Sequence, residues 1–144
     1  SAHLTRLAGA ETVYLHEVRA PGAASLVTEV GVRLPTLSTA SGRIMLAHLP
    51  EPELRAVFNA SGSRRSFREC KEELHAYRRQ GWATESQDVS RGQESVAVAV
   101  LDHLSRPAAA LAVTYPVGSA DERKLVSTLA DAAAHLRAHF FGQL

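Results

Sequence analysis

Two short stretches of the sequence, ESVAVAV at residues 94–100 and ALAVTY at residues 110–115, decide the fold. In each stretch a bulky side chain alternates with a small one, which is the period of a β-strand with one large and one small face. The segment 102–107 between them has turn composition, so we expect the strands to pair as a hairpin whose small faces coincide. The bulky face is expected to pack against helices. The small face leaves room for either a close-packed helix or a bound small molecule.

The rest of the chain alternates between strand and helix patterns. Further strands are expected at residues 12–18, 25–29 and 82–86, with residues 31–35 interrupting the second. Helices are expected at residues 38–49 and 52–58, from a capping box at Ser66 to Gly81, and from a second capping box at Ser119 to near Gly142. One apolar stripe of the last helix comprises Leu125, Leu129, Ala132, Ala133, Leu136 and Phe140. This order predicts the α+β fold class, an antiparallel sheet flanked by helices.

The totals favour one cytoplasmic domain spanning residues 1–144. A chain of 144 residues is long enough to bury a core, and its net charge of +1 lacks the basic excess of a surface that binds nucleic acid. The single cysteine, Cys70, cannot form an internal disulfide and is compatible with a reducing compartment. No apolar run is long enough to cross a membrane. Because the chain starts at Ser1 and not at methionine, we expect a fragment that carries a tag remnant at its start.

Residues with catalytic or metal-binding chemistry are sparse, and no catalytic or cofactor residue is predicted. The sequence has no Gly-x-Ser-x-Gly, Gly-x-Gly-x-x-Gly, Walker-type or Cys-x-x-Cys motif. Cys70 occupies an apolar position of a helix, which favours core packing over a nucleophile. Asp131, His135 and His139 share one side of the last helix; a solvated or subunit-facing surface is favoured there over a metal site, because no third ligand stands at a convincing spacing.

The segment TASG at residues 39–42 begins a helix with small side chains only. Exposed N–H groups at a helix start favour an anion such as a carboxylate, and small residues there also permit close packing. Both interpretations stay open on these residues alone.

Four segments together resemble the IclR family of bacterial transcription regulators. The segment GVRLPTLSTASGR (31–43) is similar to the family's G-x-R-[LV]-P-[LM]-H-A-[ST]-[AG]-x-G-K pattern. The next segment, LAHLPEPEL (46–54), also matches the family's sequence closely. Residues 81–92 are similar to the family's G-[YW]-[AT]-x-D-x-E-x-x-x-G stretch, and residues 94–116 to its two-strand segment. The order and spacing of these segments hold from about Thr12 to Phe140.

The resemblance implies a GAF/profilin-like domain that binds a small-molecule effector and self-associates as a dimer or tetramer. DNA binding would belong to an N-terminal winged helix-turn-helix domain that is absent from this chain. Carried over by motif position, the ligand-binding residues are Ala23, Leu26, Ala40, Ser41, Glu85, Ser95, Ala112 and Thr114, with Gly42 added through its backbone N–H at the helix start. No enzyme activity, cofactor, metal or membrane contact is implied.

Departures from the family pattern bear on the ligand. Ser38 replaces the usual His, Arg43 the usual Lys, Glu85 the common Asp, and Tyr115 the common Gly. Ala112 lacks a hydroxyl that family members holding small carboxylates tend to have at this position. Its loss favours a more apolar cavity and a hydroxylated or aromatic acid as ligand. Such an anion requires Glu85 either to accept a hydrogen bond from a ligand hydroxyl or to be protonated.

Three alternatives to a ligand sensor remain. The first is a purely structural oligomerisation module with a vestigial pocket. The second is a small enzyme that uses Ser41 or Ser95 with a histidine. The third is a GAF-like sensor outside the family, against which the register of the four segments argues.

Overall fold

A curled sheet of six antiparallel strands forms the centre of the chain. The computed structural model describes residues 1–19, 21 and 30–142. The strands of this described part are β1 (Ala2–Ala8), β2 (Glu11–Val18), β3 (Arg33–Pro35), β4 (Ala83–Ser86), β5 (Gln93–Leu101) and β6 (Pro107–Pro116). Their order across the sheet is β3-β2-β1-β6-β5-β4, and every neighbouring pair is antiparallel. The predicted antiparallel sheet is confirmed.

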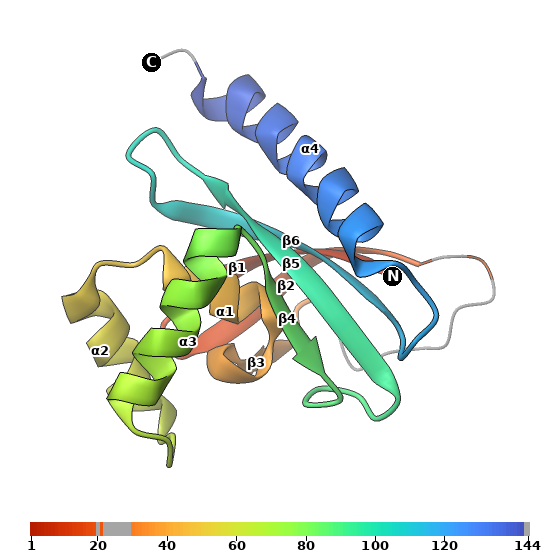
Figure 1. Cartoon of the computed structure of the whole chain (residues 1–144). Helices are drawn as coiled ribbons and strands as arrows, with labels where there is room; N and C mark the ends of the chain where they lie inside the picture. The colour runs from red at the N-terminus through yellow and green to blue at the C-terminus, as the bar shows by residue number, and fades with distance from the viewer. Residues whose placement is uncertain (20, 22–29, 143–144) are drawn as a thin grey trace.

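Helices cover both faces of the sheet (Figure 1). A 3₁₀ turn, η1 (Thr36–Ser38), leads into α1 (Ala40–Ala47), and α2 (Glu51–Ser61) and α3 (Phe67–Gln80) follow on the same side. The last helix, α4 (Glu122–Phe141), crosses the opposite face. The predicted α+β class with flanking helices is therefore also confirmed.

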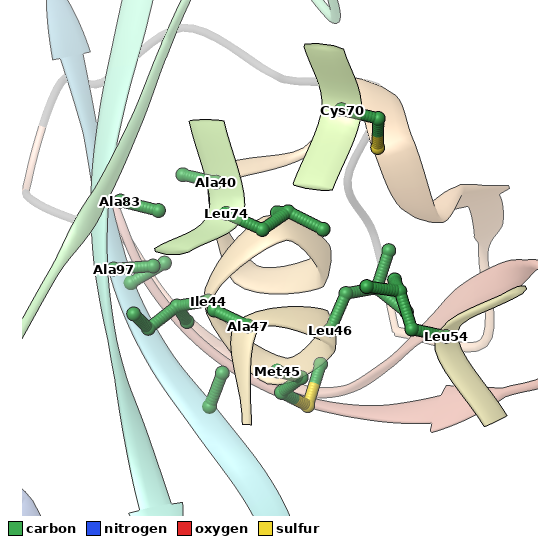
Figure 2. Close-up of a cluster of buried hydrophobic side chains, with 12 residues drawn as sticks. Ala40, Ile44, Met45, Leu46, Ala47, Leu54, Cys70, Leu74, Ala83 and Ala97 are labelled. Carbon is green, nitrogen blue, oxygen red and sulfur yellow. The ribbon is translucent and has the colours of Figure 1, made fainter. Parts of the chain in front are cut away.

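The β5–β6 hairpin has the predicted register. Ser95 pairs with Thr114 and Ala97 with Ala112, so the small faces coincide. The bulky face, which includes Val96, Val98 and Tyr115, is buried against Leu129 and Ala133 of α4. The small face is covered over its middle by a close-packed helix, because Ile44 and Ala47 of α1 pack beside Ala97 (Figure 2).

The ends of α3 follow the sequence signals, whereas α1 (Ala40–Ala47) is shorter than the helix expected at 38–49 and α2 (Glu51–Ser61) is longer than the one expected at 52–58. The hydroxyl of Ser66 accepts the N–H of Glu69 at 3.1 Å, as a capping residue should. Gly81, with φ +97°, closes α3 in the left-handed conformation. At α4 the cap is Asp121 and not Ser119: the Asp121 carboxylate accepts the N–H of Arg123 at 3.0 Å.

Four other segments differ from the expectations or lie outside the described residues. Residues 2–8, where no strand was predicted, form β1 in the middle of the sheet between β2 and β6. Residues 33–35, expected to interrupt a strand, pair with β2 as β3. On α4 the stripe is narrower than predicted, because Ala132 and Phe140 are exposed. The strand expected at 25–29 lies outside the described residues.

Gly42 permits α1 to lie close to its neighbours. A Cβ at this position would stand 2.1 Å from the Thr36 carbonyl oxygen and 2.7 Å from the Thr12 hydroxyl oxygen. In an open helix Gly→Ala is stabilising by up to about 1 kcal/mol. Here we expect Gly42→Ala to lower the free energy of unfolding by about 3 kcal/mol, measured by urea denaturation, because backbone must move.

Gly62→Ala is the matched control. Gly62 has a φ of +68°, but a Cβ added there would meet no atom within 4 Å. A loss of about 1 kcal/mol, the cost of a left-handed alanine, is expected there. Equal losses at the two positions would contradict close packing at Gly42.

Candidate functional site

A small cavity lies next to the part of the β5–β6 hairpin that α1 covers, beside the start of α1. Six of the nine residues predicted from the sequence line it: Ala40, Ser41, Glu85, Ser95, Ala112 and Thr114. The other described lining residues were missed: His3, Tyr14, Thr39, Val89, Ser90 and Gln93. The cavity volume is about 10 Å³, which is about one water molecule. A larger ligand therefore requires lining side chains to move.

The remaining three predicted residues are Gly42, Ala23 and Leu26. Gly42 is not among the described lining residues, and its N–H is bonded to the Thr39 hydroxyl at 2.9 Å. Thr39 is thus the N-cap of α1, and its hydroxyl lies 3.2 Å from that of Thr12. Ala23 and Leu26 lie outside the described residues. Ligand binding by all nine stays a prediction.

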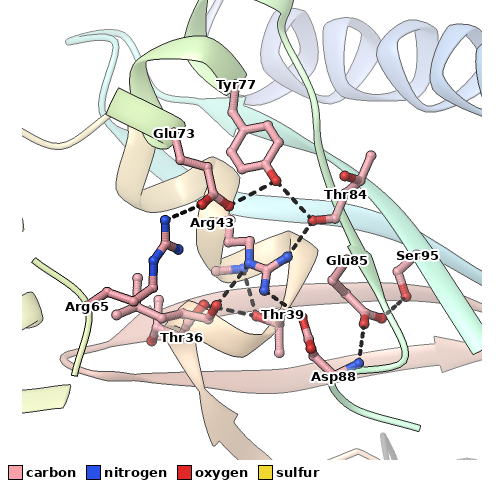
Figure 3. A network of polar contacts seen from close by, with 12 residues as sticks. Thr36, Thr39, Arg43, Arg65, Glu73, Tyr77, Thr84, Glu85, Asp88 and Ser95 are labelled. Carbon is pink, nitrogen blue, oxygen red and sulfur yellow. Dashed lines mark hydrogen bonds and ion pairs between the residues drawn. The ribbon is translucent and has the colours of Figure 1, made fainter. Parts of the chain in front are cut away.

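One wall of the cavity is a polar row of Glu85, Ser95 and Thr114, aligned in register across β4, β5 and β6. The Ser95 hydroxyl donates to Glu85 Oε1 at 2.9 Å and lies 2.8 Å from Thr114 Oγ1 (the Ser95–Glu85 bond is drawn in Figure 3). Ser95 has one hydrogen, so with Glu85 ionised the Thr114 hydroxyl must donate to Ser95. The polar row then offers the cavity lone pairs and no hydrogen.

Glu85 is buried, with 4% of its surface exposed. Burial raises the pKa of its carboxyl group, and the hydrogen bonds from Ser95 and from the N–H of Asp88 partly oppose this. A second anion beside Glu85 would be repelled, whereas a donor would be bound. The polar row therefore suits a ligand group that carries a hydrogen.

Hydrogen-bond donors are available at the start of α1. The first N–H groups of an α-helix have no partner inside the helix. Thr39 caps the N–H of Gly42, which leaves the amides of Ala40 and Ser41 as the other donors of this first turn, and both residues line the cavity. Both residues are 2% exposed. Their amides suit an acceptor such as a carboxylate.

Arg43 fixes the loop that borders the cavity. Its Nε donates to the Leu37 carbonyl at 2.9 Å, its Nη1 to the Thr84 carbonyl at 2.7 Å, and its Nη2 to Asp88 at 2.8 Å (Figure 3). Asp88 in turn donates its N–H to Glu85, so one guanidinium joins η1, β4 and the loop after β4. The sequence pattern identified Arg43 only as a departure from lysine. A planar fork explains the arginine, since a lysine has no such geometry.

His3 and Tyr14 bring a second polar side to the cavity. Their rings meet edge to face with centroids 5.4 Å apart. His3 is 3% exposed, and neither ring nitrogen has a hydrogen-bond partner among the described residues. Burial, the largest influence, lowers the pKa of His3 to about 4, so the ring is neutral at pH 7.

Other chemistry weighed from the sequence lies elsewhere. Cys70 is 3% exposed in the core beside Leu74, and burial raises its pKa. Asp131, His135 and His139 are exposed on α4, and within the described part of the chain no three such side chains gather at a metal-binding distance. In the same described part, no helix is long and apolar enough to cross a membrane.

The chain combines an antiparallel sheet with helices on both faces and a partly polar cavity between the sheet and a helix start. The family model described as "Bacterial transcriptional regulator IclR C-terminal" matches residues 1–138, and the chain belongs to this family. It is the effector-binding domain of IclR-type transcription regulators and not an enzyme.

Curated relatives are about twice as long as this chain. The transcriptional regulator XynR of Escherichia coli is 31% identical over 134 residues, covering 88% of this chain and 53% of XynR. The Pca regulon regulatory protein of Pseudomonas putida is 30% identical over 157 residues, covering 99% of this chain and 53% of that protein. The chain thus spans about half the length of these relatives.

Solved structures have the same fold. The Thermotoga maritima IclR superposes with a TM-score of 0.86 at 26% identity, over 96% of this chain and 60% of that one. A double mutant of the inducer-binding domain of PobR from Acinetobacter, solved with 3-hydroxybenzoic acid, gives a TM-score of 0.81 at 20% identity, over 94% of this chain and 86% of that one. The predicted GAF-like fold is confirmed by these likenesses.

Replacing the guanidinium fork should loosen the cavity border. We expect Arg43→Lys to lower the free energy of unfolding by about 1–2 kcal/mol, because two of three hydrogen bonds are lost. Amide hydrogen exchange at residues 87–92 should accelerate. Arg68→Lys is the control, since Arg68 is 89% exposed and pairs with Glu72 alone on its own helix. Unchanged exchange in Arg43→Lys would show that the loop is held by other contacts.

The buried His3 should make stability depend on pH. The unfolded chain binds this proton near pH 6.5 and the folded chain only near 4, so folded stability is lost as pH falls through that window. The loss is about 3 kcal/mol, from about 1.4 kcal/mol for each pKa unit. Urea denaturation at pH 7, 5.5 and 4.5 should give a flatter profile for His3→Phe than for wild type. Parallel stability profiles for the two proteins would contradict a buried neutral His3. His48 is present in both proteins, so its contribution to the pH dependence of stability cancels in the comparison.

Proposed function

We propose that this chain is the effector-sensing and self-associating domain of a cytoplasmic DNA-binding regulator, and that its ligand is a small organic or aromatic acid. The observation that carries this proposal is the cavity, where six residues chosen from sequence come together. Its acceptor row and its helix-start donors are separated, which supports a ligand with a hydroxyl at one end and a carboxylate at the other.

The named ligands and regulons of relatives support the same chemical class. PobR was solved with a hydroxylated aromatic acid, and a further relative regulates the Pca regulon. In the proposed binding mode the carboxylate meets the amides of Ala40 and Ser41. Glu85, Ser95 and Thr114 orient the hydroxyl, and Ala112 contacts the apolar part. Ala23, Leu26 and the backbone of Gly42 remain proposed contributors at the margin of this site.

Regulation would act through assembly. A DNA-reading winged helix-turn-helix domain, expected to precede this one, would be placed by a dimer or tetramer of the present domain. A ligand shifts such an arrangement only if it binds two assemblies with different affinity. Alternation between two subunit arrangements is therefore part of the proposal.

A thermal-shift screen with small organic and aromatic acids tests the ligand. At 100 times its dissociation constant a ligand stabilises the folded state by about 2.7 kcal/mol, a readily visible shift. We expect Ser41→Trp to abolish the shift, because the indole would fill the cavity beside α1. Ser127→Trp, at an exposed position of α4, is the matched control and should keep it.

Because a buried tryptophan can prevent folding, Thr114→Val supplies a second variant of nearly equal volume. It should fold and bind the acid about tenfold more weakly, through loss of one hydrogen-bonding group. If no acid shifts the melt, or if Ser41→Trp folds and responds as wild type does, the sensor proposal fails. A purely structural oligomerisation module would then be the better description.

A further inference from the structure

His3 is the buried polar side chain at the cavity whose hydrogen-bonding capacity is unused. Among the described residues, the buried side-chain atoms without a partner are both ring nitrogens of His3 and the hydroxyls of Thr5 and Thr36. Of these three residues, only His3 is among the described residues that line the cavity. Leaving a buried polar group unpaired is costly, so such a group in a cavity points to a partner that arrives from outside the chain.

The strand register places His3 next to the polar row. His3 lies directly opposite Ala112, and Thr114 is two residues further along β6 on the same face. Diagonal neighbours of this kind have Cα atoms about 7–8 Å apart. One ligand atom between the two side chains can therefore bond to both.

The two sides are complementary. A neutral imidazole has one N–H donor and one acceptor nitrogen, whereas Thr114, having given its hydrogen to Ser95, offers a lone pair. A carboxylate would satisfy His3 but be repelled by the acceptors of the polar row. A hydroxyl satisfies both, since it accepts from one neighbour and donates to the other.

We infer that His3 and Thr114 together recognise a hydroxyl group of the effector: the His3 N–H donates to the hydroxyl oxygen, which donates its hydrogen to Thr114 Oγ1. This inference rests on the proposed function and narrows its ligand class to hydroxylated acids. It also gives β1, which the sequence patterns did not identify, a direct part in specificity. The edge-to-face contact with Tyr14 holds the ring in place.

The test compares acids that differ by one hydroxyl. Calorimetry at pH 8, a pH chosen to favour the ionised form of Glu85, would use the full chain with 3-hydroxybenzoate or 4-hydroxybenzoate against benzoate, mandelate against phenylacetate, and lactate against propionate. We expect at least one hydroxylated acid to bind, at least tenfold more tightly than its counterpart. In His3→Phe the affinity for that acid should fall about tenfold to a hundredfold, while the counterpart changes by less than about threefold.

Control variants separate recognition from packing. Phenylalanine retains a ring beside Tyr14 without either nitrogen, and His3→Leu replaces it if that variant does not fold. His3→Gln restores a donor and an acceptor and should recover part of the preference for the hydroxylated acid. A packing role alone would weaken both members of each pair equally in every variant.

The outcomes are distinct. Binding of an acid with no preference for the hydroxylated member, or a preference that survives in His3→Phe, overturns this inference and leaves the proposed function standing. Binding of none of these acids to the wild-type chain counts against the proposed function, and the inference falls with it.

Discussion

The close approach of α1 to the small face of the β5–β6 hairpin is the constraint on which the rest of the structure depends. Alanines at 97, 110 and 112 leave no bulk on the sheet, and Gly42 leaves none on the helix where it meets η1. Burial of Ile44 and Met45 follows from that approach. Where the alanines give way to Ser95 and Thr114, apolar contact stops, and a polar cavity takes its place.

Polar contacts at that border act as one unit because each shares a partner with the next. Arg43 bonds to β4 and to Asp88, Asp88 to Glu85, and Glu85 to Ser95. A buried polar network of this kind is favourable only when its members are satisfied. Among the described lining residues, His3 has no partner for either ring nitrogen, whereas each of the three guanidinium nitrogens of Arg43 donates a hydrogen bond. This contrast supports the proposed recognition role of His3.

Sequence patterns predicted those parts of the fold where side-chain period and burial agree. The hairpin, the cap at Ser66 and the Gly81 terminus belong to this group. β1 was missed because its inward side chains, His3 and Thr5, are polar, so alternation marked no apolar face. The role of Arg43 was missed because its partners are backbone carbonyls, Leu37 and Thr84, that no side-chain pattern reveals. The resemblance located half of the twelve described lining residues, and it missed the wall contributed by β1 and β2 as well as Thr39, Val89, Ser90 and Gln93.

The sheet consists of two three-stranded halves, β1–β3 and β4–β6, joined where β1 pairs with β6. Across this seam Ser1 and Thr114, 113 positions apart, exchange backbone hydrogen bonds. Contacts between such distant segments carry a loop-closure cost, and we expect them to form late in folding. Both halves of the sheet line the cavity, since His3 lies on β1 and Thr114 on β6. The cavity is therefore complete only when β1 and β6 have paired. Contacts made after the transition state slow unfolding without speeding folding. A ligand held across the seam would therefore lengthen the lifetime of the folded chain.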